Sequence, residues 1–202
     1  MKKTITGFAC ALALTLPVAV SAQVAWDSPM LMPPNPSGEF GIFLMDAAGG
    51  GVAALGTWRS PSWNFGLRAG IAEDASDGVA LFGGVDYNGV VNRATAEFPV
   101  DVDWVLGAGI GIGDNVLVSV PVGLTAGHRF VGDGATFTPY ITPRVVLDGF
   151  FGDDANDENL GLDFAIDLGL DLQLPARTLT GMTIRFGGTF GDREAIALGV
   201  VF

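Results

Sequence analysis

The chain has 202 residues and a formal net charge of −12 at pH 7, although 49% of its residues are hydrophobic. Ten basic residues against 22 acidic ones leave no basic patch for a phosphate backbone, which excludes a nucleic-acid partner. Beyond residue 22 no run approaches the roughly 20 apolar residues of a membrane helix, so the apolar residues must be distributed by alternation.

The first 22 residues have the features of a secretory signal peptide. Lys2 and Lys3 precede the apolar run ITGFACALALTLPVAV, and the small residues at 20–22 predict cleavage before Gln23. The alternatives are an uncleaved anchor and a lipoprotein modified at Cys10, although the residues before Cys10 match a lipobox poorly. Cleavage removes both lysines and leaves 8 Arg against 22 acidic residues, a net charge of −14 (8 − 22). It also leaves no cysteine for disulfides, metal sites or thiol catalysis.

Residues 23–37 are rich in proline and predict an irregular segment, whereas residues 38–202 form one domain of alternating strands. The clearest case is LGLDFAIDLGLDLQLP, residues 160–175. As a helix its leucines would cover every face, but as a strand they share one face and the aspartates share the other. Ten such segments follow one another: 38–46, 52–59, 63–71, 78–87, 101–112, 116–129, 137–150, 160–175, 181–190 and 194–202.

The alternation is inverted relative to that of a soluble β-sandwich. One face carries large apolar residues without helices or a second sheet to cover it, while the other carries Gly, Ala, Thr, Asp and Arg. Lipid is the cover that remains, and a sheet in lipid must have no free edge. The sequence therefore predicts an all-β fold, a closed antiparallel up-and-down transmembrane β-barrel of about ten strands. Eight strands are the runner-up, and a soluble β-sandwich is the alternative.

Two features depart from this simple pattern. Pro121 and Pro143 lie inside predicted strands, where each removes a hydrogen-bond donor, so we expect a bulge or a misplaced strand boundary at both. The connection 88–99 is long for a barrel turn, and a short amphipathic helix is one prediction for it.

The chain resembles the integral outer-membrane β-barrel proteins of didermal, Gram-negative-type bacteria. The resemblance rests on the signal peptide, the alternation from residue 38 onwards and the last strand, REAIALGVVF, in which Ile196, Leu198, Val200 and Phe202 alternate. In that class the barrel-assembly machinery reads such a terminal strand. The resemblance implies Sec-type export to the cell outer membrane, insertion by that machinery, a surround of outer-membrane lipid and a monomeric barrel.

Charged residues on the small, polar face are predicted to share the lumen. Charges enclosed in a narrow barrel must be paired or hydrated, so we expect a salt-bridged polar core. The alternative is a narrow, porin-like passive channel for small solutes or cations, since ten strands lie between filled barrels of about eight and open porins of about sixteen. The predicted lumen charges are Arg68, Asp86, Asp101, Asp103, Arg129, Arg144, Asp148, Asp163, Asp167, Asp171 and Arg185.

Catalytic, cofactor-binding and metal-binding residues are not expected. His128 is the only histidine, and Ser119 lies nine strand residues away, roughly 30 Å, so the two cannot form a hydrolase pair. The acidic loop 152–159 does not match the template of a calcium loop, and we interpret it as a solvated loop. The sequence thus predicts a non-enzymatic structural or interaction protein, and a lipid-modifying enzyme is the least favoured alternative.

Overall fold

The computed structural model describes residues 26–47, 51–73, 78–113, 115–152, 160–173 and 181–202 of the chain. The predicted signal peptide, its cleavage site and nearly all of the acidic loop 152–159 lie outside these residues. Within the described ranges, no helix has the length and apolar character needed to cross a membrane.

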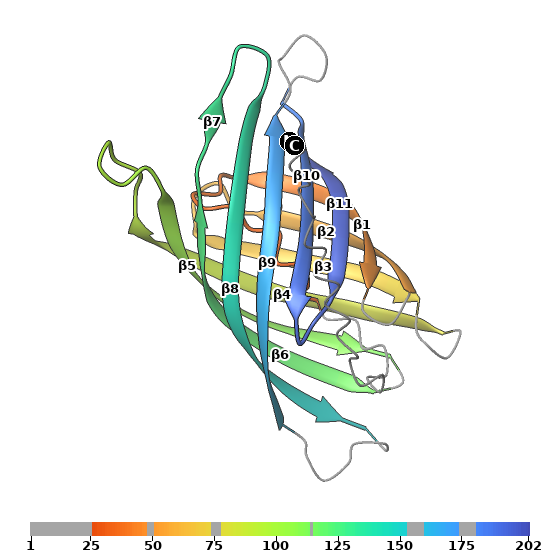
Figure 1. The fold of residues 1–202 in the computed structure, drawn as a ribbon. Helices are drawn as coiled ribbons and strands as arrows, with labels where there is room; N and C mark the ends of the chain where they lie inside the picture. The colour runs from red at the N-terminus through yellow and green to blue at the C-terminus, as the bar shows by residue number, and fades with distance from the viewer. Residues whose placement is uncertain (1–25, 48–50, 74–77, 114, 153–159, 174–180) are drawn as a thin grey trace, which may run out of the picture.

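The described strands form one antiparallel sheet that closes on itself (Figure 1). Each long strand pairs with the next along the chain, and the wall closes where β1 pairs with β11. Ten long strands and the two-residue β7 make up this wall, which confirms the predicted transmembrane β-barrel of about ten strands. The strands are β1 (Glu39–Ala47), β2 (Gly51–Arg59), β3 (Phe65–Glu73), β4 (Val79–Asn92), β5 (Asp101–Ile112), β6 (Val116–Gly127), β7 (Phe130–Val131), β8 (Thr136–Phe151), β9 (Leu160–Gln173), β10 (Thr183–Gly191) and β11 (Ala195–Val201).

The period-2 alternation decides which side chains face outwards. In β9, Phe164 is 60% exposed, whereas Ala165 and Asp167 on the opposite face are 2% and 1% exposed. Large apolar side chains cover the outside of all ten long strands in the same way. Because so continuous an apolar surface is unsuited to water, the surroundings that match this exterior are lipid.

The two strand prolines leave the register unchanged. Pairing of β5 with β6 is interrupted beside Pro121, and pairing of β6 with β8 is interrupted beside Pro143. Both pairings resume with the same register on the far side of the proline. The prediction of a bulge or a misplaced boundary at these prolines is therefore wrong, because the flanking ladder bonds hold each strand in line despite the lost donor.

The connection after β4 contains no helix, since every residue from 78 to 112 is described. The β-branched pair Val90 and Val91 favours a strand, and β4 continues to Asn92 with a β-bulge between Val90 and Asn92. Residues 93–100 then form a loop, so the helix expected within 88–99 is wrong. The short β7, which alternation did not predict, pairs with the start of β8.

Residues 26–34 lie inside the barrel, and we call them the plug segment. All nine residues are buried, although none belongs to a strand. The chain enters the lumen at the end where β1 begins and β11 finishes, which we call the entry end (Figure 1). The opposite end, with the β10–β11 turn, is called the far end. The lumen is thus occupied by the residues that precede the first strand.

Candidate functional site

The interface between the plug segment and the barrel wall begins at Trp26, which is fully buried on a floor of glycines. A Cβ atom on Gly84, Gly107 or Gly109 would come within 2.5, 2.7 or 2.3 Å of the indole ring. Real Cβ contacts do not fall below 3.0 Å, so these positions accept the indole only as glycines. The guanidinium carbon of Arg68 lies 5.9 Å from the ring centre, within range of a cation–π contact.

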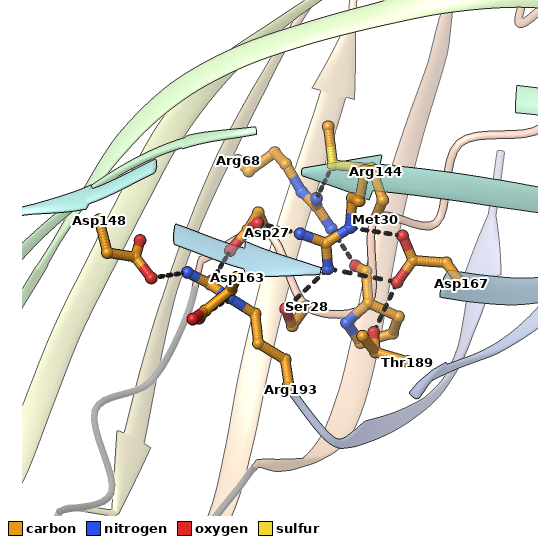
Figure 2. Close-up of polar contacts among 11 residues, drawn as sticks. Asp27, Ser28, Met30, Arg68, Arg144, Asp148, Asp163, Asp167, Thr189 and Arg193 are labelled. Carbon is orange, nitrogen blue, oxygen red and sulfur yellow. Dashed lines mark hydrogen bonds and ion pairs between the residues drawn. The ribbon is translucent and has the colours of Figure 1, made fainter. Parts of the chain in front are cut away.

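Asp27 is bound by two arginines that come from different parts of the wall (Figure 2). One is Arg144 of β8, whose Nη1 donates to the Asp27 carboxylate. Arg144 also donates through Nε to Asp167 of β9 at 2.7 Å and through Nη2 to the hydroxyl of Ser28 at 2.9 Å. Thr189 of β10 donates to the other side of the Asp167 carboxylate at 2.6 Å. This group therefore links the plug segment to three neighbouring strands.

The second arginine is Arg193, in the β10–β11 turn at the far end. Its Nη1 donates to Asp27 at 2.7 Å, its Nη2 donates to Asp148, and its Nε donates to Asp163 at 3.1 Å. Burial raises the pKa of Asp27, but the guanidiniums of Arg144, Arg193 and Arg68, together with a backbone hydrogen bond, outweigh burial and hold that pKa below its ordinary value. The Asp27 carboxylate is therefore ionised at neutral pH although it is fully buried.

Side chains of the wall, rather than a neighbouring strand, bind the backbone of the plug segment. Its prolines at positions 29, 33 and 34 have no N–H group, so the segment has fewer donors that need partners. The segment is thus held inside the barrel without joining the sheet. The bonds to its carbonyl oxygens run from Arg68 to Pro29 (2.8 Å), from Arg185 to Leu31 (3.1 Å) and from Thr125 to Met32 (2.9 Å).

Further ion pairs lie nearer the entry end. Each joins side chains from different elements, and the partners inside the lumen are shielded from water. Removing one partner of such a pair leaves an uncompensated buried charge, so these pairs hold different elements of the barrel together across the lumen. They are Arg185 with Glu39 and Asp171 (both 2.7 Å), Arg59 with Asp86, and Arg93 with Asp103 (2.6 Å).

The structure brings ten of the eleven predicted lumen charges to the inner face of the wall. Arg129 is the exception, because it is exposed at the entry end and donates to the Gln173 side chain at 3.2 Å. Half-buried carboxylates in ion pairs are Asp101, Asp163 and Asp171. Residues with 4% exposure or less are Arg68, Asp86, Asp103, Arg144, Asp148, Asp167 and Arg185.

Sequence reasoning missed several partners in this network. Arg59 carries a signal that would have found it, since it follows the outward-facing Trp58 on a predicted strand and must face inwards. Asp27 and Arg193 carry no such signal, because one lies in the irregular segment and the other in a turn. A period-2 pattern says nothing about the direction of side chains outside a strand.

Six buried side-chain polar atoms have no hydrogen-bond partner among the described residues, and three of them lie close to the buried end of the plug segment. These three are Trp26 Nε1, Ser119 Oγ and Asp148 Oδ1. The indole packs on Gly109, which pairs with Ser119 across β5 and β6, and Ser119 pairs with Asp148 across β6 and β8. The three atoms therefore lie along one row of the lumen.

A polar cavity of about 230 Å³ opens where the chain enters the barrel. It lies between residues 33–37 and the wall, with Arg129, Asp171 and Gln173 among the side chains that line it. The chain is therefore packed more loosely at the entry end than around Trp26 and Asp27.

The serine and the histidine considered for catalysis are apart in the structure. Ser119 is fully buried within β6, whereas His128 lies beyond the end of β6 with its ring 4.4 Å from that of Phe130. Across the described residues, no group of three or more His, Cys, Asp or Glu side chains is arranged to hold a metal ion.

The last strand has the outward pattern on which the predicted assembly signal depends. Ile196, Leu198 and Phe202 are each at least 50% exposed, and Val200 is half-buried. The backbone of Phe202 exchanges hydrogen bonds of 2.8 and 3.1 Å with that of Phe40, which joins the end of the chain to the start of β1. The role of these residues in assembly stays a prediction.

By its fold, the chain is a transmembrane β-barrel with an apolar exterior and a charged interior. No protein-family model matches its sequence, and no curated protein does. Solved structures that are similar in fold include the following two. A de novo designed transmembrane β-barrel is 11% identical with a TM-score of 0.36, over 84% of this chain and 98% of that one. The outer membrane enzyme PagL is 13% identical with a TM-score of 0.42, over 81% of this chain and 98% of that one.

The likeness to PagL corrects the prediction that the chain is not an enzyme. That prediction rested on the scarcity of histidine and serine, but a barrel of similar fold is the scaffold of an outer-membrane enzyme. We therefore withdraw the exclusion of catalysis. At this identity the likeness concerns the fold alone, and we assign no reaction to this chain.

Proposed function

We propose that the chain is an outer-membrane β-barrel protein of a Gram-negative-type bacterium, with a structural or interaction role and a lumen closed at rest. The observation that carries this proposal is the buried plug segment, in which Trp26 and Asp27 fill the lumen between the glycine floor and the arginines. Export by the predicted signal peptide and the apolar exterior support the location. The predicted partners are outer-membrane lipid and the assembly machinery, with the barrel as a monomer.

An open passive channel is less well supported. The plug segment occupies the path that solutes would take, and the carboxylates that would attract cations are bound to arginines. A barrel of ten strands has room for a path of this kind only when nothing else fills its interior.

The conductance of the wild-type protein tests this proposal. The mature chain, residues 23–202, would be refolded in detergent, checked for heat-modifiable migration on a gel and inserted into planar bilayers. We expect a folded barrel without conductance steps. Regular steps from the folded wild-type chain at low voltage would contradict a lumen that is closed at rest.

A further inference from the structure

We propose that the closure is reversible: the plug segment is a gate, and its withdrawal through the entry end opens a path for small hydrated cations. This inference rests on the closed lumen proposed above and adds a function to it. Three properties of the structure carry it. The strand pairings of the wall do not include the segment, polar atoms at the contact between segment and wall lack partners, and the lining that the segment covers is polar and acidic.

The wall is complete without the plug segment. The ten long strands close through their own pairings, and residues 26–34 contribute to none of these ladders. Three of the four arginines that bind the segment through ion pairs or carbonyl bonds also hold carboxylates of the wall, whereas Arg68 donates to Met30 and to the Pro29 carbonyl of the segment. Arg144 keeps Asp167 at 2.7 Å, Arg193 keeps Asp163 at 3.1 Å, and Arg185 keeps two carboxylates. Withdrawal would therefore break no strand pairing and leave these guanidiniums paired.

Polar atoms also remain unpaired where the plug segment meets the wall, one on the segment and two on the wall strands β6 and β8. Trp26 Nε1, Ser119 Oγ and Asp148 Oδ1 are buried without a partner among the described residues. Water entering an open lumen would supply these bonds, so unpaired polar groups favour withdrawal. The polar cavity at residues 33–37 places loosely packed space on the side from which the chain enters.

The surface that the segment covers is suited to small cations. Glycines lie beneath Trp26 and Leu31, so withdrawal would leave open space at those positions. Among the described residues, the ion pairs contain nine carboxylates and five guanidiniums, and the buried Arg68 adds a sixth. Without Asp27, eight carboxylates face six guanidiniums, an excess of two negative charges (8 − 6). A narrow path with this lining favours cations over anions.

A reversible covalent lock tests the gate. A Cβ atom at Gly187 would lie 2.6 Å from Leu31 Cδ2, so Leu31→Cys and Gly187→Cys put two thiols at facing positions of the segment and β10, and formation of the disulfide would be checked by mass spectrometry. The mature chain has no other cysteine. In this background, Trp26→Ala and Asp27→Ala remove the main anchors of the segment. The matched control carries the same cysteine pair with Trp26 and Asp27 intact.

Conductance would be recorded from the same bilayer before and after reduction. We expect the oxidised barrel to be silent, and reduction to raise the open probability at least about tenfold, with steps that are larger for potassium than for chloride. The control is expected to change far less on reduction. A water-soluble maleimide reports withdrawal independently, because it reacts with the thiols introduced at positions 31 and 187 only when the segment has left its place in the lumen.

Two results would overturn the gate. If the reduced variant is folded and silent while the thiols react, the segment leaves but no path exists. If the reduced variant is folded and silent while the thiols stay protected, the segment is a fixed part of the core. Conductance from the oxidised, locked barrel is a separate outcome that contradicts the closed lumen itself, so the two proposals fail in distinguishable ways.

Discussion

Replacing Trp26 with alanine removes the largest side chain in the lumen. The indole is fully buried, and its floor consists of Gly84, Gly107 and Gly109, which have no side chains to move into the space. Replacing a buried Phe or Trp with alanine costs about 3–5 kcal/mol, and the value is higher where the surroundings cannot collapse. We therefore expect Trp26→Ala to lower the free energy of unfolding by about 4–5 kcal/mol.

Urea unfolding of the refolded barrel in lipid vesicles measures this change. The matched control is Trp63→Ala, because Trp63 is 69% exposed in the turn between β2 and β3. Its removal is expected to change stability by no more than about 0.5 kcal/mol. If the two variants differ by less than about 1 kcal/mol, the indole of Trp26 does not fill the lumen and the reasoning is refuted.

Four further changes probe the rest of the barrel. Arg185→Ala leaves two carboxylates without their cation and is expected to lower the free energy of unfolding by about 3–5 kcal/mol. Arg129→Ala, at the exposed entry end, is expected to leave it nearly unchanged, and urea unfolding compares the two variants. Gly109→Val places a Cβ atom 2.3 Å from the indole and is expected to cost about 1–3 kcal/mol, and an unchanged midpoint would argue against this contact. Ile166→Arg puts a charge on the lipid-facing side of the middle of β9 and is expected to lower the free energy of unfolding, measured in vesicles, by about 2–4 kcal/mol. Because Asp27 has a lowered pKa in the folded state, its ionised carboxylate stabilises the fold at pH 7, and this stabilisation is lost progressively below about pH 5. The difference in unfolding free energy between the wild type and Asp27→Asn is therefore expected to shrink as the pH falls from 7 through that range.

The fold was predictable from the sequence because a strand in lipid needs a strict alternation. In 160–175 the period of two separates leucines from aspartates without ambiguity, and the same period recurs in nine other segments. The inward direction of Asp167 follows from the same pattern as the outward direction of Phe164. The prolines were harder to interpret, because a lost donor does not show whether neighbouring bonds will hold the strand in register.

The contents of the lumen were not predictable in the same way. The sequence predicts only an irregular segment at 23–37 and leaves open whether it enters the barrel. Asp27 accepts a hydrogen bond from Arg193, which lies 166 positions later in the chain. No local sequence pattern relates an irregular segment to a distant turn. The glycines beneath Trp26 were visible as small residues of the inner face, but the bulky side chain that they accommodate was not.

The most direct test of the account is the accessibility of two serines on the same segment. Ser28 is 4% exposed beside Arg144, whereas Ser37 is exposed at the entry end. The variants Ser28→Cys and Ser37→Cys each add one thiol to a mature chain that has none, and a water-soluble maleimide measures their reactivity in the folded barrel. We predict that Ser28→Cys reacts at least about a hundredfold more slowly than Ser37→Cys and equally fast once unfolded. Equal rates in the folded barrel would show that the segment does not lie in the lumen.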